Sequence, residues 1–151
     1  MVLRELVTAA LLDMKLASLK GAKGPIYLLF TAEKDDSGRR WCPDCRNAEP
    51  VLEEAFLSLP ASATILEIPL SRESWKGPTG PKHPFRSPPY NVKGIPTLCL
   101  WDAVDQKVLK KFTESECEQL ESLTELMSSH YRTARGEVYE LYNFVQDSNF
   151  N

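Results

Sequence analysis

The stretch Trp41-Cys42-Pro43-Asp44-Cys45 carries the strongest functional signal in this chain. Its two cysteines stand three positions apart, so both sulfurs can meet in one small disulfide ring. A cysteine at the start of a helix lies beside unpaired backbone N–H groups and the positive end of the helix macrodipole, which favour its thiolate. Because the thiolate is the attacking species in disulfide exchange, the motif indicates redox chemistry.

The bulk composition is that of a single ordinary domain. The chain has 151 residues, which suffice for one compact domain with a hydrophobic core. It is 42% hydrophobic and 26% charged, and its net charge of -3 gives no reason to expect nucleic acid or a membrane as partner. No apolar run approaches the roughly 20 residues of a membrane helix. The amphipathic N-terminal stretch contains Glu5 and Asp13, whereas targeting peptides are usually poor in acidic residues, so we expect it to be a helix of the mature domain. We accordingly expect a cytoplasmic protein, and we expect it to be a monomer.

Cysteine usage favours a redox site over a structural one. The chain has four cysteines, and a disulfide scaffold of this length would usually carry more. A structural zinc site usually needs a second close pair of ligands. Cys99 and Cys117 are far apart in the sequence, and the two histidines show no ligand spacing. We therefore expect no metal, and a redox-active pair in a reducing compartment.

Apolar spacing predicts a mixed α/β domain. The expected helices cover 3–19, 46–59 and 116–128, with a further one over about 135–146, and the expected strands cover 26–30, 64–68, 97–101 and 107–112. The segment 71–92 is rich in proline and glycine, and a loop of that length is more often functional than accidental. Strand–helix–strand order followed by a hairpin predicts a central mixed sheet flanked by helices.

Motifs along the chain narrow the prediction to one family. They are Phe30-Thr31, Lys34-Asp35, the cysteine motif, Ala48-Glu49-Pro50-Val51, Trp75-Lys76, Pro78, Phe85-Arg86, Ile95-Pro96-Thr97-Leu98 and Glu114-Ser115-Glu116-Cys117. With them the chain resembles the thioredoxin superfamily over about 26–129, and within it the thioredoxin domain-containing protein 17 family. The resemblance implies a thioredoxin-like domain over 1–132, followed by a C-terminal helical extension over 133–151. Only two residues precede the first helical pattern, so we expect the family's first edge strand to be missing.

The motif cysteines have distinct expected roles. Cys42 is the expected nucleophile, which attacks a substrate disulfide, and the more buried Cys45 then attacks Cys42 to release the product. A structural or metal-binding pair is the alternative. Pro43 fixes a backbone angle in the first helical turn. The carboxylate of Asp44 suits a helix N-terminus but repels a thiolate, so the resemblance implies that both linker residues tune the redox potential; the alternative for Asp44 is a solvated helix cap.

The expected substrate groove lies beside the dithiol. The resemblance implies a cis peptide bond at Pro96, with the backbone of Ile95 pairing with an extended substrate. Trp41 is expected to cover the disulfide. Trp75 and Phe85 are expected to flank the groove, with packing in the core as their alternative.

Other candidate residues concern protons and charge. Leu29 stands where an ordinary thioredoxin keeps a buried aspartate, so Cys45 needs another proton acceptor, for which Asp44, Glu33 and water stay open. Cys99 is expected to be an inert buried thiol, and Cys117 to be structural or, alternatively, regulatory. The charged loop with Lys34-Asp35-Asp36 and Arg39-Arg40 is expected to be solvated, or to select partners by charge.

The resemblance implies a dithiol–disulfide oxidoreductase that reduces protein and small-molecule disulfides. It also implies electrons from NADPH through thioredoxin reductase, no bound cofactor, and a modest peroxidase activity at the same thiols. Two alternatives remain open at this point. One is a non-catalytic thioredoxin-like module that binds proteins, and the other is a glutathione-linked enzyme.

Overall fold

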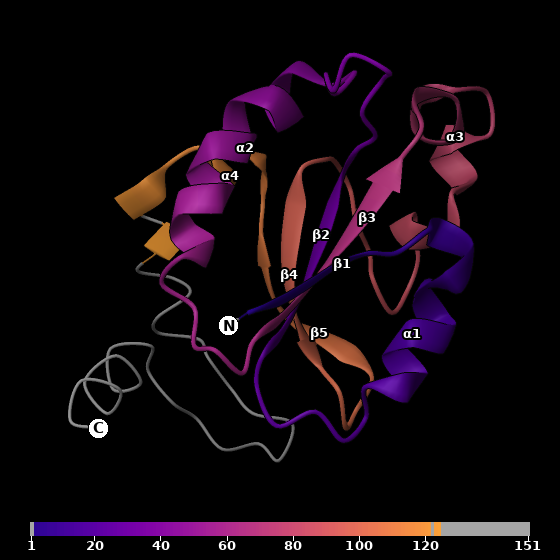
Figure 1. Cartoon of the computed structure of the whole chain (residues 1–151). Coiled ribbons are helices and arrows are strands. Elements are labelled where there is room, and N and C mark those ends of the chain that lie inside the picture. Colours follow the sequence, from indigo (N-terminus) through magenta and orange to yellow (C-terminus); the bar gives the residue numbers. More distant parts are fainter. Residues whose placement is uncertain (1, 122, 125–151) are drawn as a thin grey trace.

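The computed structural model describes residues 2–121 and 123–124 and contains one five-stranded mixed sheet. The strands are β1 (Leu3–Leu6), β2 (Ile26–Ala32), β3 (Thr64–Leu70), β4 (Thr97–Asp102) and β5 (Lys107–Phe112). Their order across the sheet is β1-β3-β2-β4-β5 (Figure 1). Strands β1, β3 and β2 run parallel, and β4 pairs antiparallel with both β2 and β5. The predicted α/β fold with a mixed sheet and a terminal hairpin is confirmed.

Helices cover both faces of the sheet. Helices α2 (Pro43–Phe56) and α4 (Glu114–Cys117) lie on one face, and α1 (Leu12–Ser18) and α3 (Arg72–Lys76) lie on the other (Figure 1). Short 3-10 turns span Ala9–Leu11, Gly80–Lys82 and Pro84–Arg86. The proline-rich segment 71–92 is therefore built from short helical turns. No helix among the described residues is long and apolar enough to cross a membrane.

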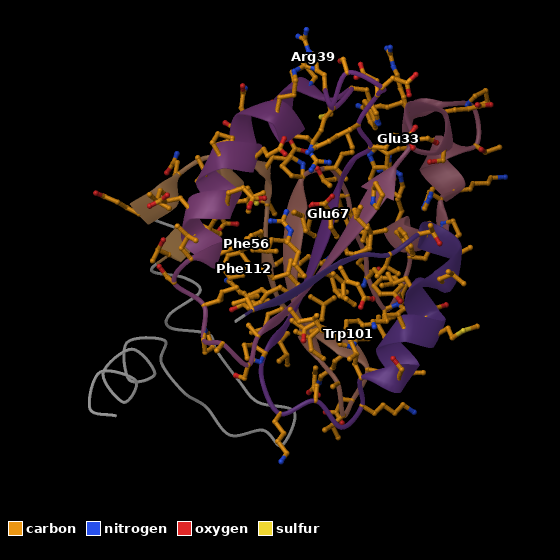
Figure 2. All side chains as sticks on the ribbon, in the orientation of Figure 1. Glu33, Arg39, Phe56, Glu67, Trp101 and Phe112 are labelled. Atoms are coloured by element: carbon orange, nitrogen blue, oxygen red, sulfur yellow. The ribbon has the colours of Figure 1, made fainter. Side chains whose placement is uncertain are left out.

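The sheet divides the core into two clusters. Alternate residues of β2 serve opposite faces, so Leu28 packs on the α1 side and Leu29 on the α2 side. Figure 2 shows Phe56 and Phe112 on the α2 side and Trp101 toward α1, in agreement with their clusters. Because both faces are covered, β2 and β3 are nearly continuous apolar runs.

The first edge strand is present, so the prediction that it is missing is wrong. Strand β1 pairs in parallel with β3, from Leu3 opposite Thr64 to Leu6 opposite Glu67. Backbone bonds from Leu3 to Ala63 and from Val7 to Glu67 complete the pairing. The predicted helix over 3–19 therefore shortens to α1, which begins at Leu12. The open edge of β3 offers backbone partners to this segment, and that pairing overrides its helical apolar spacing.

The helix after the cysteine motif begins earlier than its apolar pattern does. Helix α2 starts at Pro43, inside the motif, and continues through Pro50 to Phe56. A proline in the first turn costs nothing, since that N–H would have no helical partner. The predicted extension over 133–151, with its helix over about 135–146, lies outside the described residues.

Candidate active site

The dithiol sits at the N-terminus of α2. Cys42 is the N-cap residue, with extended backbone angles (φ -98°, ψ 121°), and Pro43 is the first helical residue. The first amides of α2 have no helical partner and carry the positive end of the macrodipole. Cys42 is 7% exposed and Cys45 is 2% exposed, so the expected nucleophile is the more accessible thiol. All four cysteines are unpaired thiols in the structure.

The proline loop lies against the first thiol. The peptide bond between Ile95 and Pro96 is cis, as predicted. The Cys42 thiol points at the Ile95 carbonyl oxygen, with Sγ and O 3.8 Å apart. The hydroxyl of Thr97 donates to the carbonyl of Gly94 at 2.6 Å, which closes the loop. The chain just before Pro96 is thus held beside Cys42, where the groove was predicted.

Trp41 is anchored beside the dithiol. Its indole Nε1–H donates to the Leu70 carbonyl at 2.7 Å, at the end of β3. The half-buried ring packs against the core cluster that contains Cys42 and Cys45. A ring with one face on the core and its N–H satisfied keeps part of its apolar surface accessible at the site.

Trp75 and Phe85 belong to the core, so their assignment to the groove is a wrong prediction. They are 2% and 5% exposed. The ring of Phe85 packs edge-on against Phe30, with centroids 5.1 Å apart, and the guanidinium of Arg86 lies 3.6 Å from the centroid of the Trp75 ring. These contacts attach segment 71–92 to the α1 side of the sheet. Burial of the two large apolar rings stabilises the folded protein, whereas exposure to water would not.

Cys45 is held as a neutral thiol. The backbone N–H of Ala32 donates to its Sγ at 3.4 Å. Burial raises the pKa of Cys45 to about 12, although hydrogen bonds from Thr31 and Ala32 act in the opposite direction. At neutral pH this thiol keeps its proton, so a base must remove the proton before Cys45 can attack a disulfide.

A chain of alternating charges lies behind Cys45, and Arg40 is its centre. Contrary to the prediction of a solvated loop, the Arg40 side chain is 3% exposed. It donates to the Ala32 carbonyl at 2.7 Å and to Glu49 at 3.1 Å, and lies 3.5 Å from Glu67. A buried guanidinium is tolerated only when its donors are satisfied in this way. Figure 2 shows Glu67 near the middle of the sheet.

The chain of charges extends to both sides of Arg40. Arg4 of β1 contacts Glu67 at 2.9 Å and Glu53 at 2.6 Å. Lys34 contacts Glu49 at 3.1 Å. We call these six residues the Arg40 network; they are Arg4, Lys34, Arg40, Glu49, Glu53 and Glu67. The network links the edge strand, the sheet centre, α2 and the loop before the cysteine motif.

A small cavity separates Cys45 from this network. Its volume is about 10 Å³, and it is lined by Arg4, Leu29, Thr31, Arg40, Cys45, Glu49, Leu52 and Glu53. Leu29 lies in β2 beside the cavity, so the central strand offers Cys45 an apolar side chain there. The predicted acceptors Asp44 and Glu33 are both exposed and line no part of the cavity.

Sequence reasoning missed two acidic residues at the site. Glu49 follows Cys45 by four positions, a spacing that places both on one face of a helix and that could have identified it. Glu114 begins α4, and its carboxyl lies close enough to that of Asp44 for the two charges to interact. Burial, followed by the charge of Asp44, raises the pKa of Glu114. A pocket of about 520 Å³ adjoins Glu114 and the proline loop at Gly94.

The remaining cysteines are deeply buried, as predicted for an inert thiol and a structural one. Burial raises the pKa of both Cys99 and Cys117 to about 12. The thiol of Cys117 donates to the Phe112 carbonyl at 3.3 Å. Within the described residues, no group of three or more potential metal ligands of the His, Cys, Asp or Glu type is found.

Comparison with known proteins identifies the family. Residues 8–129 match the family described as "Thioredoxin domain-containing protein 17-like, thioredoxin domain". The chain belongs to this family. It is 32% identical to human thioredoxin domain-containing protein 17 over 105 residues, which cover 69% of this chain and 77% of that protein. It is 34% identical to the thioredoxin-like protein Clot of Arabidopsis thaliana over 79 residues, which cover 50% of this chain and 57% of that protein.

Solved structures agree on the fold. Thioredoxin NaTrxh from Nicotiana alata superposes with a TM-score of 0.55 at 15% identity, covering 86% of this chain and 96% of that one. Thioredoxin O1 from Arabidopsis thaliana, in its oxidised state, gives a TM-score of 0.52 at 19% identity, with 87% and 98% covered. This member of the thioredoxin domain-containing protein 17-like family therefore has a thioredoxin fold, the fold of thiol–disulfide oxidoreductases.

Proposed function

We propose that this protein is a dithiol–disulfide oxidoreductase that reduces disulfides in selected proteins and in small molecules. The observation that carries the proposal is the position of Cys42: it caps α2, lies 3.8 Å from the carbonyl before the cis proline, and has Cys45 one helical turn behind it. Family membership supports the same chemistry.

The first step is attack by the Cys42 thiolate on a substrate disulfide. A bond forms between Cys42 Sγ and one substrate sulfur, the substrate S–S bond breaks, and the other substrate sulfur leaves as a thiolate. The amide end of α2 stabilises the attacking thiolate. The backbone of Ile95 is positioned to pair with the extended substrate chain around its disulfide, and Trp41 supplies the adjacent apolar surface.

The second step is resolution by Cys45. Once deprotonated, its sulfur attacks Cys42 Sγ, a Cys42–Cys45 disulfide forms, and the second substrate sulfur leaves as a thiolate. Pro43 and Asp44 lie between the two cysteines, so we propose that they set the redox potential of the pair. A peroxidase reaction follows from the same thiols: Cys42 attacks a peroxide to give a sulfenic acid and an alcohol or water, and Cys45 then displaces water.

The oxidised pair must be reduced again for turnover. We propose that the protein works in the cytoplasm and that NADPH supplies the electrons through thioredoxin reductase. Without such a donor, each catalytic cycle would leave the protein with an oxidised Cys42–Cys45 pair. The chain itself contributes only the dithiol to this transfer.

The test is consumption of NADPH with thioredoxin reductase and a small disulfide, comparing the wild type with Cys42→Ser and Cys117→Ser. We expect turnover by the wild type and by Cys117→Ser, and none by Cys42→Ser. Turnover that persists in Cys42→Ser would overturn the proposed nucleophile. If the wild type turned over with glutathione and glutathione reductase but not with thioredoxin reductase, the proposed electron donor would be contradicted.

A further inference from the structure

The resolving thiol needs a proton acceptor that the central strand does not provide. Cys45 is 2% exposed and neutral. Strand β2 contributes the side chains of Leu29 and Thr31 to the cavity beside it, and neither is a carboxylate. The cavity beside Cys45 measures about 10 Å³. That volume is at the lower limit of what one water molecule requires. Beside the apolar Leu29 and Leu52, the cavity wall carries the polar groups of Thr31, Arg40 and Glu49.

Three carboxylates lie around this cavity, and their contacts differ. Glu49 and Glu53 line it directly, from successive turns of α2, and Glu67 of β3 lies one residue further away behind Arg40 and Arg4. Glu53 is paired with Arg4 at the protein surface, where its side chain is 47% exposed. The side chain of Glu49 is 31% exposed and is paired with Arg40 and Lys34.

We propose that Glu49, through one water molecule in this cavity, accepts the proton of Cys45 during resolution, and that Arg40 positions Glu49 for this transfer. The inference rests on the disulfide exchange proposed above. Glu49 follows Cys45 by one turn of the same helix, so both side chains lie on one helical face. Arg40 holds the carboxylate through Nε and Nη2 and is itself fixed to the Ala32 carbonyl, next to the amide that binds Cys45 Sγ.

The protonation state of Glu49 suits a base. Burial alone would raise its pKa, but hydrogen bonds from Lys34 and Arg40 outweigh burial and hold the pKa below its usual value. Glu49 is therefore ionised at neutral pH and can accept a proton, and its pairing with Lys34 and Arg40 makes it a weaker base than an unpaired glutamate. Of the charged groups around the cavity, Arg4, Arg40, Glu49 and Glu53 line its wall, while Lys34 and Glu67 touch those residues from behind.

The proton and electron pairs balance across the step. The S–H proton of Cys45 passes to the bridging water, which gives a proton to Glu49. The Cys45 sulfur forms its bond to Cys42 Sγ, the bond between Cys42 and the substrate sulfur breaks, and the substrate leaves with the electron pair. Glu49 then returns its proton to solvent through its exposed edge, so no additional reactant is consumed.

Stopped-flow reaction with 5,5′-dithiobis(2-nitrobenzoate) separates the two chemical steps. Attack by Cys42 on this reagent releases one thionitrobenzoate, and attack by Cys45 on the mixed disulfide releases a second. The first phase tests the proposed function, and the second phase tests Glu49. The proteins are the reduced full chain, Glu49→Gln, Glu49→Asp, and the controls Glu53→Gln and Glu54→Gln. Glu54 is an exposed residue of the same helix that does not line the cavity.

We expect Glu49→Gln to slow the second phase by about 100-fold or more, since general base catalysis typically contributes that much. The first phase should change by less than about threefold, because Cys42 does not use this cavity. The rate of the second phase in Glu49→Gln should rise about tenfold per pH unit, since hydroxide becomes the base, whereas the wild-type rate should be flatter. Glu49→Asp should recover part of the loss.

The outcomes separate the two ideas. A missing first phase in the wild type would overturn the proposed function. A normal first phase with a second phase in Glu49→Gln within twofold of wild type, or an equal loss in Glu53→Gln, would overturn the role of Glu49 and leave disulfide exchange standing. A loss in Glu49→Gln with an unchanged pH slope would also overturn it, because that result indicates a structural effect alone.

Discussion

Replacement of Arg40 by methionine should destabilise the protein far more than its position in a charged loop suggests. The Arg40 side chain is 3% exposed and contacts the Ala32 carbonyl, Glu49 and Glu67. Methionine fills much of the space but satisfies none of these groups. The side chain of Glu67 is 10% exposed and, among the residues that the structure describes, would keep Arg4 as its one ion-pair partner.

The magnitude follows from these contacts. Removing one partner of a buried ion pair costs about 3–5 kcal/mol, because the remaining charge stays buried without compensation. An unpaired buried carbonyl costs about 1–3 kcal/mol on its own. Since Glu49 is partly exposed and methionine regains apolar contacts, we expect a loss of about 3 kcal/mol in the free energy of unfolding. For a chain of this size that loss lowers Tm by about 6–12 °C.

Urea unfolding of the reduced protein measures this loss, with Arg39→Met as the matched control. Arg39 is the neighbouring arginine of the same loop, and it is exposed. Its replacement should change the free energy of unfolding by about 0.5 kcal/mol or less. Adding Glu67→Gln to Arg40→Met should recover part of the loss, because it removes a buried carboxylate that has lost one of its two cationic partners. A loss below about 1 kcal/mol in Arg40→Met, or one equal to that of Arg39→Met, would refute the reasoning.

The loss should also depend on pH. The pKa of Glu49 is lower in the folded protein than in the unfolded chain, where it is about 4.3. Its ionised form therefore adds stability above the unfolded pKa, and this contribution disappears as pH falls through the folded pKa. The difference between wild type and Arg40→Met should accordingly narrow in acid, measured as unfolding free energy from about pH 7 to about pH 3.

Three further predictions concern the dithiol and its surroundings. Asp44→Gly should change the redox potential of the pair and favour the Cys42 thiolate, measured against glutathione buffers and by alkylation rate; two unchanged values would remove Asp44 from the mechanism. Glu114→Gln should raise the free energy of unfolding at neutral pH, because the raised pKa of Glu114 means that its ionised form is disfavoured in the folded protein. This gain should vanish in acid, below the pKa of the unfolded chain, where the carboxyl is protonated in both states. Equal gains in free energy at neutral and acid pH would contradict this. Iodoacetamide should modify Cys42 rapidly and leave Cys99 and Cys117 intact in the native protein, as read by peptide mass spectrometry; comparable labelling of all three would contradict their burial.

The sheet and the dithiol could be predicted from the sequence because their signals are local. Apolar runs bounded by breakers identified β2, β3 and β4, and the cysteine motif placed Cys42 near the start of α2, although the apolar pattern began that helix only at residue 46. Strand β1 could not be identified in this way. Its leucines also fit a helix, and what makes it a strand is the free edge of β3, which lies about 60 residues away in the sequence.

The parts of the site that depend on local backbone geometry were predicted from the sequence. The parts that depend on charge pairing between distant residues were missed. The cis bond before Pro96 and its contact with Cys42 were expected from a short motif. The burial of Arg40 was not, because an arginine in a charged loop is normally solvated. Its environment depends on Glu67 of a different strand and Glu49 of the next helix, and only folding brings these residues together.

The most direct test of the central claim is mass spectrometry of the reduced chain after reaction with an excess of a small disulfide, with free thiols then alkylated. Dithiol–disulfide exchange predicts two product thiols per chain, a disulfide between Cys42 and Cys45, and Cys99 and Cys117 recovered as thiols. The absence of released thiol, or a disulfide that involves Cys99 or Cys117 in place of the motif pair, would contradict the account.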